Sequence, residues 1–422
     1  MRQILSSDIP RWIPKTEADL QAAIDGGLVE ESHTLDLKEA PSNKNDNKEL
    51  ARDLASFAVD GGTLIIGVKE NKDSRTFELA PQPMNGLPEK VEQVARSIPD
   101  PPLNVITEVI DSTTGSNTGY LVVHIPASPA APHMVDGRYF GRGDKTKHRL
   151  TDPEVLRLHA QRNAAEADAL ALLQKEMDQD PLRDVGEQSH FFLVAQPAAG
   201  RRDLLLGLTG APDWNIRLAR LIERAHQGRE LNEVLGNLGG FSPGLSDAHQ
   251  GHRRAGGVAR SSANLGDGRT YTPGALHGDE NVIELQVFEN GGLRLFLTRF
   301  SDTIGTPDKP EQQLIPAAAV LLTRRLLEIL RLVAEDSAYF GNWSLAVGVS
   351  RMRGRRSYQG PETWNTFGTN PRYSEDIYQE ATGATLAELT AAQGAVTRRL
   401  LGPLLRSLSL EGVYEKALTD NQ

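Results

Sequence analysis

The chain has 422 residues, of which 24% are charged and 39% are apolar, a composition typical of a soluble protein with two or three domains. It contains no cysteine, which excludes disulfide bonds, thiolate metal sites and cysteine nucleophiles. No window approaches the roughly 20 apolar residues that a membrane span needs. We therefore expect a cytoplasmic protein without a membrane partner.

Four elements are predicted in the first 70 residues. A capped helix begins at Thr16 and ends at the glycine pair 26–27. Leucine alternates with polar residues over 34–39, which predicts a half-buried strand. Apolar residues recur at helical spacing over 48–59, and the unbroken apolar run TLIIGV at 63–68 predicts a central strand covered on both faces.

Strand and helix signals continue through the next ninety residues. VITEVIDS (105–112) and GYLVVHIPAS (119–128) predict a pair of strands, and the glycine-rich segment 137–150 predicts a turn that carries positive charge. Asp152-Pro153 has the cap and the first-turn proline of a helix, which we expect to run to about Met177.

Two stretches of this part resemble a known family. The order of Glu31, Asp36-Leu-Lys, the helix end SFAVDGG and the strand TLIIGVKE is similar to the AlbA-type (AlbA-2) domain of bacterial Schlafen proteins. APHMVDGRYFGRGDKTKHRLTDPEVLRL at 131–158 is similar to the closing hairpin and helix of that domain. The resemblance covers about residues 16–160. It implies an α+β fold whose N-terminal part is a mixed sheet with helices. A second α/β domain, which resembles no family, is expected to follow.

The predicted domains are a Schlafen AlbA-type domain at 1–165, a helical linker at 166–187 and a C-terminal α+β domain of unknown type at 188–422. In the last domain we predict a strand at 190–197, a hairpin about Asn290-Gly291 and an amphipathic helix from Pro316. The segment around 236–279 is rich in glycine and polar residues. It predicts an irregular insertion.

Glu31, Asp36 and Glu70 are the candidate catalytic and metal-binding carboxylates. Hard divalent cations bind clustered carboxylate oxygens, and a metal so held can polarise a phosphodiester and activate water. The resemblance implies such a site, because ribonucleases of the family use two acidic residues on the first strand and one after the glycine strand. Asp36 stands where glutamate is usual, and Glu70 stands where aspartate is usual. The expected cofactor is Mg²⁺ or Mn²⁺.

The alternative is that these three carboxylates face water at strand ends. Positions 31 and 36 point to opposite faces of a regular strand, so the cluster requires a bulge or a strand start between them. Lys38 shares the face of Asp36, and we count it among the catalytic candidates. Its ammonium group either neutralises a phosphate or pairs with the carboxylate.

The formal net charge of −10 means that any contact with nucleic acid must come from a local basic patch. The first candidate patch consists of Arg138, Arg142, Lys145, Lys147 and Arg149. A second group, near Tyr358 and Trp364, consists of Arg351, Arg353, Arg355 and Arg356. The alternative for both groups is a solvated surface.

Three functions compete at this point. The first is a metal-dependent endoribonuclease that cleaves transfer RNA or other structured RNA, in phage defence or a stress response. The alternative is a non-catalytic module that binds DNA, RNA or a nucleotide, such as a transcriptional regulator. The third is a nucleotide sensor or scaffold. No G-x4-G-K-[ST] motif supports the ATP-binding label that family members often carry. The expected partners are nucleic acid, RNA ahead of DNA, and a second copy of the chain in a homodimer.

Overall fold

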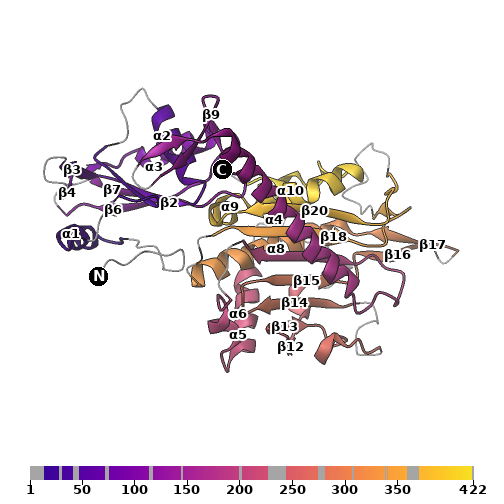
Figure 1. The fold of residues 1–422 in the computed structure, drawn as a ribbon. Coiled ribbons are helices and arrows are strands. Elements are labelled where there is room, and N and C mark those ends of the chain that lie inside the picture. Colours follow the sequence, from indigo (N-terminus) through magenta and orange to yellow (C-terminus); the bar gives the residue numbers. More distant parts are fainter. Residues whose placement is uncertain are drawn as a thin grey trace. The chain divides into compact units, whose positions relative to one another are not determined.

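The computed structural model describes most of the chain between residues 14 and 420. The residues left undescribed are 1–13, 28–30, 41–46, 72–75, 114–116, 144–145, 199–201, 227–243, 274–280, 307, 338, 340, 359–369 and 421–422. The chain divides into two compact units, residues 1–163 and 164–422. Both units combine helices with open sheets (Figure 1), which confirms the predicted α+β class. None of the described helices is long and apolar enough to cross a membrane.

The first unit carries most of the residues that were singled out in the sequence. Its elements are α1 (Glu17–Asp25), β1 (Leu35–Lys38), α2 (Asn47–Phe57), β2 (Gly62–Ile66), β3 (Val68–Asn71), β4 (Thr76–Leu79), β5 (Gln82–Pro83), α3 (Leu87–Ser97), β6 (Ile106–Asp111), β7 (Thr118–Ile125), β8 (Met134–Val135), β9 (Arg138–Arg142), β10 (Lys147–Arg149) and α4 (Asp152–Asp178), which continues into the second unit. The strands predicted at 34–39 and 63–68 and the helix predicted at 48–59 are confirmed.

The main sheet of this unit is mixed, and its two faces have separate cores. The strand order is β1-β2-β7-β5, with β6 also paired to β7; β1 is parallel to β2 and the other pairs are antiparallel. Leu54 and Phe57 of α2 pack with Val91 of α3 on one face. Leu20 and Ala23 of α1 belong to the core of the other face. Helices α1 and α2 therefore cover opposite faces of the sheet.

The second unit is built on a larger sheet. Its elements are β11 (Phe191–Pro197), α5 (Leu206–Thr209), α6 (Trp214–His226), the 3₁₀ helix η1 (Leu245–Asp247), β12 (Gln250–Arg254), β13 (Gly257–Ser261), the 3₁₀ helix η2 (Asp267–Arg269), β14 (Ile283–Phe288), β15 (Leu293–Leu297), β16 (Ser301–Thr306), β17 (Lys309–Leu314), α8 (Pro316–Asp336), β18 (Trp343–Val349), β19 (Arg356–Ser357), β20 (Tyr378–Ala384), α9 (Leu386–Ala391), α10 (Gln393–Ser407) and α11 (Glu415–Leu418).

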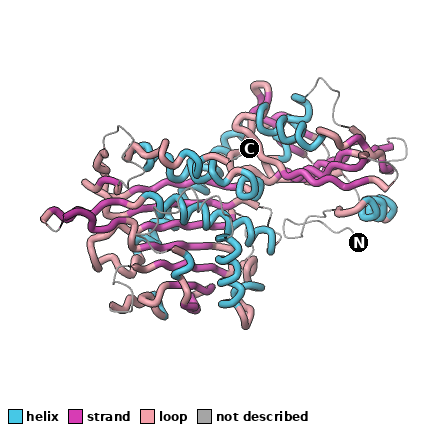
Figure 2. The backbone as a smooth tube through the Cα atoms, turned by 180° about the vertical axis from the view of Figure 1, so that it is seen from behind, coloured by secondary structure: helices cyan, strands magenta, loops and turns pink. Residues whose placement is uncertain are grey.

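Seven antiparallel strands form this sheet in the order β12-β13-β14-β15-β11-β18-β20. The strands of the second unit lie side by side in Figure 2. One face packs on the buried helix α8 through residues such as Leu326 and Leu330. Leu173 and Met177 at the end of α4 pack on the other face, against Phe192. The hairpin predicted about Asn290-Gly291 and the helix predicted from residue 316 are both confirmed.

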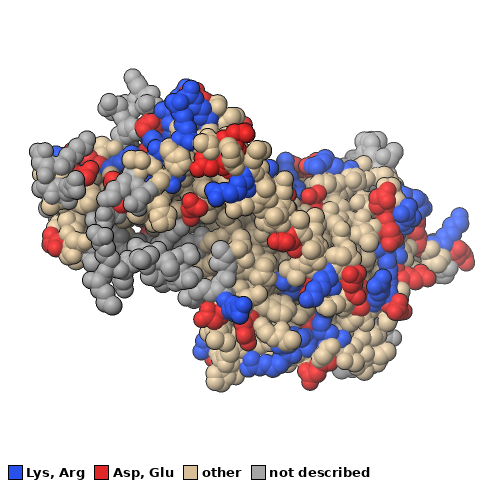
Figure 3. All heavy atoms as spheres, in the orientation of Figure 1, with Lys and Arg blue, Asp and Glu red and all other residues tan. Residues whose placement is uncertain are grey.

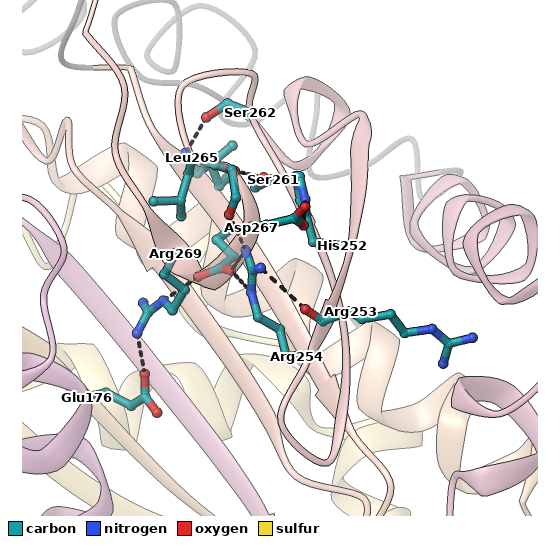
Figure 4. Close-up of polar contacts among 12 residues, drawn as sticks. Glu176, His252, Arg253, Arg254, Ser261, Ser262, Leu265, Asp267 and Arg269 are labelled. Atoms are coloured by element: carbon teal, nitrogen blue, oxygen red, sulfur yellow. Dashed lines mark hydrogen bonds and ion pairs between the residues drawn. The ribbon is translucent and has the colours of Figure 1, made fainter.

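Part of the segment that was expected to be irregular, 236–279, forms regular structure. Strands β12 and β13 pair in an antiparallel hairpin that extends the large sheet, so the prediction was wrong for residues 250–261; residues 236–243 and 274–279 lie outside the described part. Polar strand residues are tolerated there because their charges are paired. Arg254 donates to the fully buried Glu284 at 2.9 Å, and Arg269 donates to the same carboxylate at 2.8 Å. Figure 4 shows Arg269 beside Glu176 of α4, with which it pairs at 3.4 Å.

Candidate nucleic-acid interface and the adjoining carboxylates

A tight turn brings Glu31 beside the first strand. The backbone N–H of Ser32 donates to the carbonyl of Leu35 at 2.9 Å, and the N–H of Leu35 donates back to Ser32 at 3.3 Å. Because the chain reverses here, Glu31 lies next to β1 and accepts a hydrogen bond from the backbone of Leu37. A reverse turn therefore brings Glu31 beside Asp36, where a bulge or a strand start had been expected.

The three predicted carboxylates influence one another electrostatically. The pKa of Glu31 is raised, first by its partial burial and then by the negative charge of Asp36, with a smaller contribution from Glu70. The Leu37 hydrogen bond acts in the opposite direction and only partly offsets these effects. Glu70 follows the central strand on β3 and is exposed. The fold thus brings the predicted residues into one neighbourhood.

Two cations already neutralise the buried member of this group. Asp36 Oδ1 lies 2.9 Å from Arg142 Nη2, and Asp36 Oδ2 lies 3.5 Å from Lys38 Nζ. Within the described ranges, no three or more histidine, aspartate or glutamate side chains are arranged to hold a metal ion. In this arrangement Arg142 and Lys38 therefore balance the negative charge of Asp36.

The sequence did not predict a role for Asp53 of α2, although its carboxylate contacts both Lys38 of β1 and Lys147 of the basic hairpin. Its side chain is only 3% exposed; it lies 2.9 Å from Lys38 Nζ and accepts a hydrogen bond from Lys147 Nζ at 2.7 Å. Burial acts to lower the pKa of Lys38, but the charges of Asp53 and Asp36 outweigh it, and the pKa is raised. Its position in the helix could have indicated that it is buried. Asp53 lies three residues after Leu50 and four before Phe57, which places it on the apolar face of the helix.

The hairpin β9–β10 divides the predicted basic residues into two kinds. Arg142 and Lys147 are paired across the hairpin. Arg142 is 4% exposed at its side chain and packs over the Phe57 ring at 4.3 Å, while Lys147 also pairs with Glu49. Arg138 and Arg149 are exposed, and neither forms an ion pair with another described residue. Lys145 lies outside the described residues.

Further charges surround the N-terminal turns of α2. Lys48 Nζ lies 3.0 Å from Asp136 Oδ1, and Arg52 lies 3.6 Å from Asp136 and 3.1 Å from Glu49. We call Lys48, Glu49, Arg52 and Asp136 the α2 surface cluster. On the face of the first unit that Figure 3 shows, Lys and Arg atoms are interspersed with Asp and Glu atoms. Positive and negative side chains therefore lie close together on this face.

The second basic group is occupied by contacts within its own unit. Arg351 donates to the backbone carbonyl groups of residues 185, 186 and 188 at 3.1–3.4 Å. Arg355 donates to two serine hydroxyl groups at 2.7 and 2.9 Å, and burial lowers its pKa. Arg356 pairs with Glu311. These arginines hold loops in place, and Trp364 lies outside the described residues.

The fold and the site define an α+β protein whose first unit carries a mixed sheet and a charged hairpin. Residues 31–151 match the family described as Schlafen, AlbA_2, which confirms the resemblance seen in the sequence for this part of the chain. The N-terminal unit thus carries a domain of the Schlafen AlbA_2 type. This match points to a function related to nucleic acid.

Two solved structures are similar to parts of the chain. The N-terminal domain of a putative ATP-dependent DNA helicase RecG-related protein from Nitrosomonas europaea is 20% identical, with a TM-score of 0.24, over 31% of this chain and 90% of that one. The DIP2311 protein from Corynebacterium diphtheriae is 16% identical, with a TM-score of 0.22, over 53% of this chain and 41% of that one. A comparison with curated proteins found no match.

Proposed function

We propose that the first unit binds nucleic acid through the exposed arginines of its closing hairpin. The observation that carries the proposal is that the basic residues of the hairpin differ in their contacts. Arg142 and Lys147 hold the hairpin against β1 and α2. Arg138 and Arg149 are exposed. Exposed guanidinium groups on a fixed scaffold can contact phosphate oxygens in any sequence. The family match supports a role related to nucleic acid.

Binding isotherms over a range of salt concentrations test this proposal. Fluorescence anisotropy with labelled transfer RNA, single-stranded RNA and duplex DNA would be measured for the intact chain. Replacing Arg138 and Arg149 by alanine should weaken binding and flatten the salt slope by about 0.7–0.9 for each lost phosphate contact. Arg96→Ala, which removes an exposed arginine from α3, is the matched control. A double variant that binds like Arg96→Ala would contradict the proposal.

A second candidate function is a metal-dependent endoribonuclease that acts on transfer RNA or other structured RNA. The observation that favours it is the approach of Asp36 and Glu70 to Glu31, whose pKa is raised first by its burial and then by these negative charges. The ion pair between Asp36 and Arg142 opposes it, because that cation occupies the carboxylate that the metal needs. We keep Mg²⁺ or Mn²⁺ as the proposed cofactor and Lys38 as a proposed catalytic residue.

Cleavage assays separate this candidate from simple binding. Labelled transfer RNA would be incubated with the protein and increasing Mg²⁺ or Mn²⁺, and with EDTA as the metal-free control. If the carboxylates form the site, Glu31→Ala, Asp36→Ala and Glu70→Ala each abolish cleavage while circular dichroism stays unchanged. Cleavage that persists in any of them removes that residue from the site.

We further propose that RNA is preferred over DNA and that the protein acts as a homodimer. The formal net charge of −10 disfavours the binding of a phosphate backbone. Two copies of the chain would place twice as many exposed arginines along that backbone and raise the local positive potential. Light scattering tests the assembly. A mass near 46.0 kDa at micromolar concentration would rule out the dimer.

A further inference from the structure

We propose that Asp136 and Glu49 are internal competitors of phosphate, and that bound nucleic acid displaces them from Lys48 and Arg52. The interface would then extend from the hairpin onto helix α2. This inference rests on the proposed binding function. It adds two contact residues and two inhibitory carboxylates that were not among the site residues predicted from the sequence.

The ion pairs of the α2 surface cluster are among the exposed ion pairs of this unit. The side chains of Lys48 and Asp136 are 57% and 51% exposed, and Glu49 is 36% exposed. Exposed ion pairs are weak because water screens them, whereas the pairs of Arg142 and Asp53 are buried and remain fixed. A polyanion that arrives at the surface can therefore take the place of these carboxylates on Lys48 and Arg52 while Glu49 keeps its ion pair with Lys147.

Phosphate can take the place of either carboxylate on chemical grounds. Both anions present oxygen acceptors to guanidinium and ammonium groups, and phosphate does so along the whole length of a nucleic-acid strand. Lys48 and Arg52 lie on the same face and successive turns of α2, so the two cations can contact neighbouring phosphates. A competing carboxylate within the protein lowers the number of such contacts.

The cluster is continuous with the arginines of the proposed interface. Asp136 and Gly137 form the turn between β8 and β9, and Arg138 follows directly. The pKa of Asp136 is lowered by the hydrogen bond and charge of Lys48 and, to a smaller extent, by the charges of Arg52 and Arg138. All three cations therefore interact with the carboxylate of Asp136. Removing its charge leaves Lys48 available to a phosphate group close to Arg138.

Asp136→Asn is a clean test of the competition. Asp136 adopts φ 54°, a left-handed conformation that asparagine tolerates as well as aspartate, so the turn is kept while the charge is removed. Asp25→Asn is the matched control. It changes the net charge equally, but it lies on α1, which covers the opposite face of the sheet from α2. Its carboxylate accepts a hydrogen bond from Gln21 and forms no ion pair with another described residue.

The measured quantity is the salt slope of binding to a labelled single-stranded RNA by the full chain. Because Arg52 keeps its ion pair with Glu49, Asp136→Asn makes Lys48 available and steepens the slope by about 0.7, the contribution of one phosphate contact on a single strand. Affinity at low salt rises at the same time. Adding Lys48→Ala and Arg52→Ala to Asp136→Asn should return the slope to the wild-type value.

Each outcome separates this inference from the proposed binding function. If the Arg138/Arg149 double variant loses affinity but Asp136→Asn binds like Asp25→Asn, the competition is refuted and the binding function stands. Tighter binding by Asp136→Asn that survives the loss of Lys48 and Arg52 also refutes it. Absence of binding by wild type and Asp136→Asn alike overturns both. Binding that appears only in Asp136→Asn supports the competition directly.

Discussion

Replacing Asp53 by asparagine should destabilise the first unit more than any surface substitution. The side chain is 3% exposed and contacts Lys38 at 2.9 Å and Lys147 at 2.7 Å. Removing one partner of a buried ion pair costs about 3–5 kcal/mol, because the remaining charge stays buried without compensation. Lys38 and Lys147 are 28% and 21% exposed and keep Asp36 and Glu49 as second partners, so we expect the lower end, about 3 kcal/mol.

The assay is thermal and urea unfolding of the full chain, followed by circular dichroism and calorimetry. A loss of about 3 kcal/mol lowers the melting temperature of a unit of this size by about 6–12 °C. Asp25→Asn serves as the control, and an exposed site of this kind should change stability by less than about 0.5 kcal/mol. A loss below about 1 kcal/mol in Asp53→Asn would refute the reasoning, since the buried network would then not stabilise the unit.

Three further predictions concern single side chains. The pKa of Glu31 is raised above its ordinary value of 4.5, so folding favours the protonated carboxyl group. The free energy of unfolding should therefore fall as the pH rises from about 4.5 through the folded-state pKa. Glu31→Gln should remove this pH dependence and stabilise the protein at pH 7, as measured by urea unfolding at several pH values. A Cβ on Gly62 would lie 2.1 Å from Phe57 Cδ1, so Gly62→Ala should cost about 1–3 kcal/mol, and unchanged stability would contradict the tight packing. Glu284→Gln removes the carboxylate that pairs with Arg254 and Arg269. It should lower the free energy of unfolding of the second unit by about 3 kcal/mol or more, with no change in the hydrogen exchange of the first unit.

The sequence by itself determined those elements whose signals are local. Alternation of leucine with polar residues predicted β1, an apolar run predicted β2, and an Asn-Gly pair between alternating segments predicted the β14–β15 hairpin. Each signal spans a few residues, because strand and helix periodicity reflects which face of one element is buried. The family resemblance of the N-terminal part also came from contiguous motifs, and the match over residues 31–151 confirmed it.

Only the tertiary structure decided how the charges are used. Residues 250–261 look too polar for a sheet until Arg254 is placed beside Glu284, which lies 30 residues further along the chain. Asp53 and Lys147 are 94 residues apart, and no local pattern shows that they are paired. The basic residues of the hairpin look alike in the sequence, yet Arg142 and Lys147 are paired with buried carboxylates while Arg138 and Arg149 face water. An ion pair depends on distances between side chains from different elements, and those distances exist only after the elements have packed.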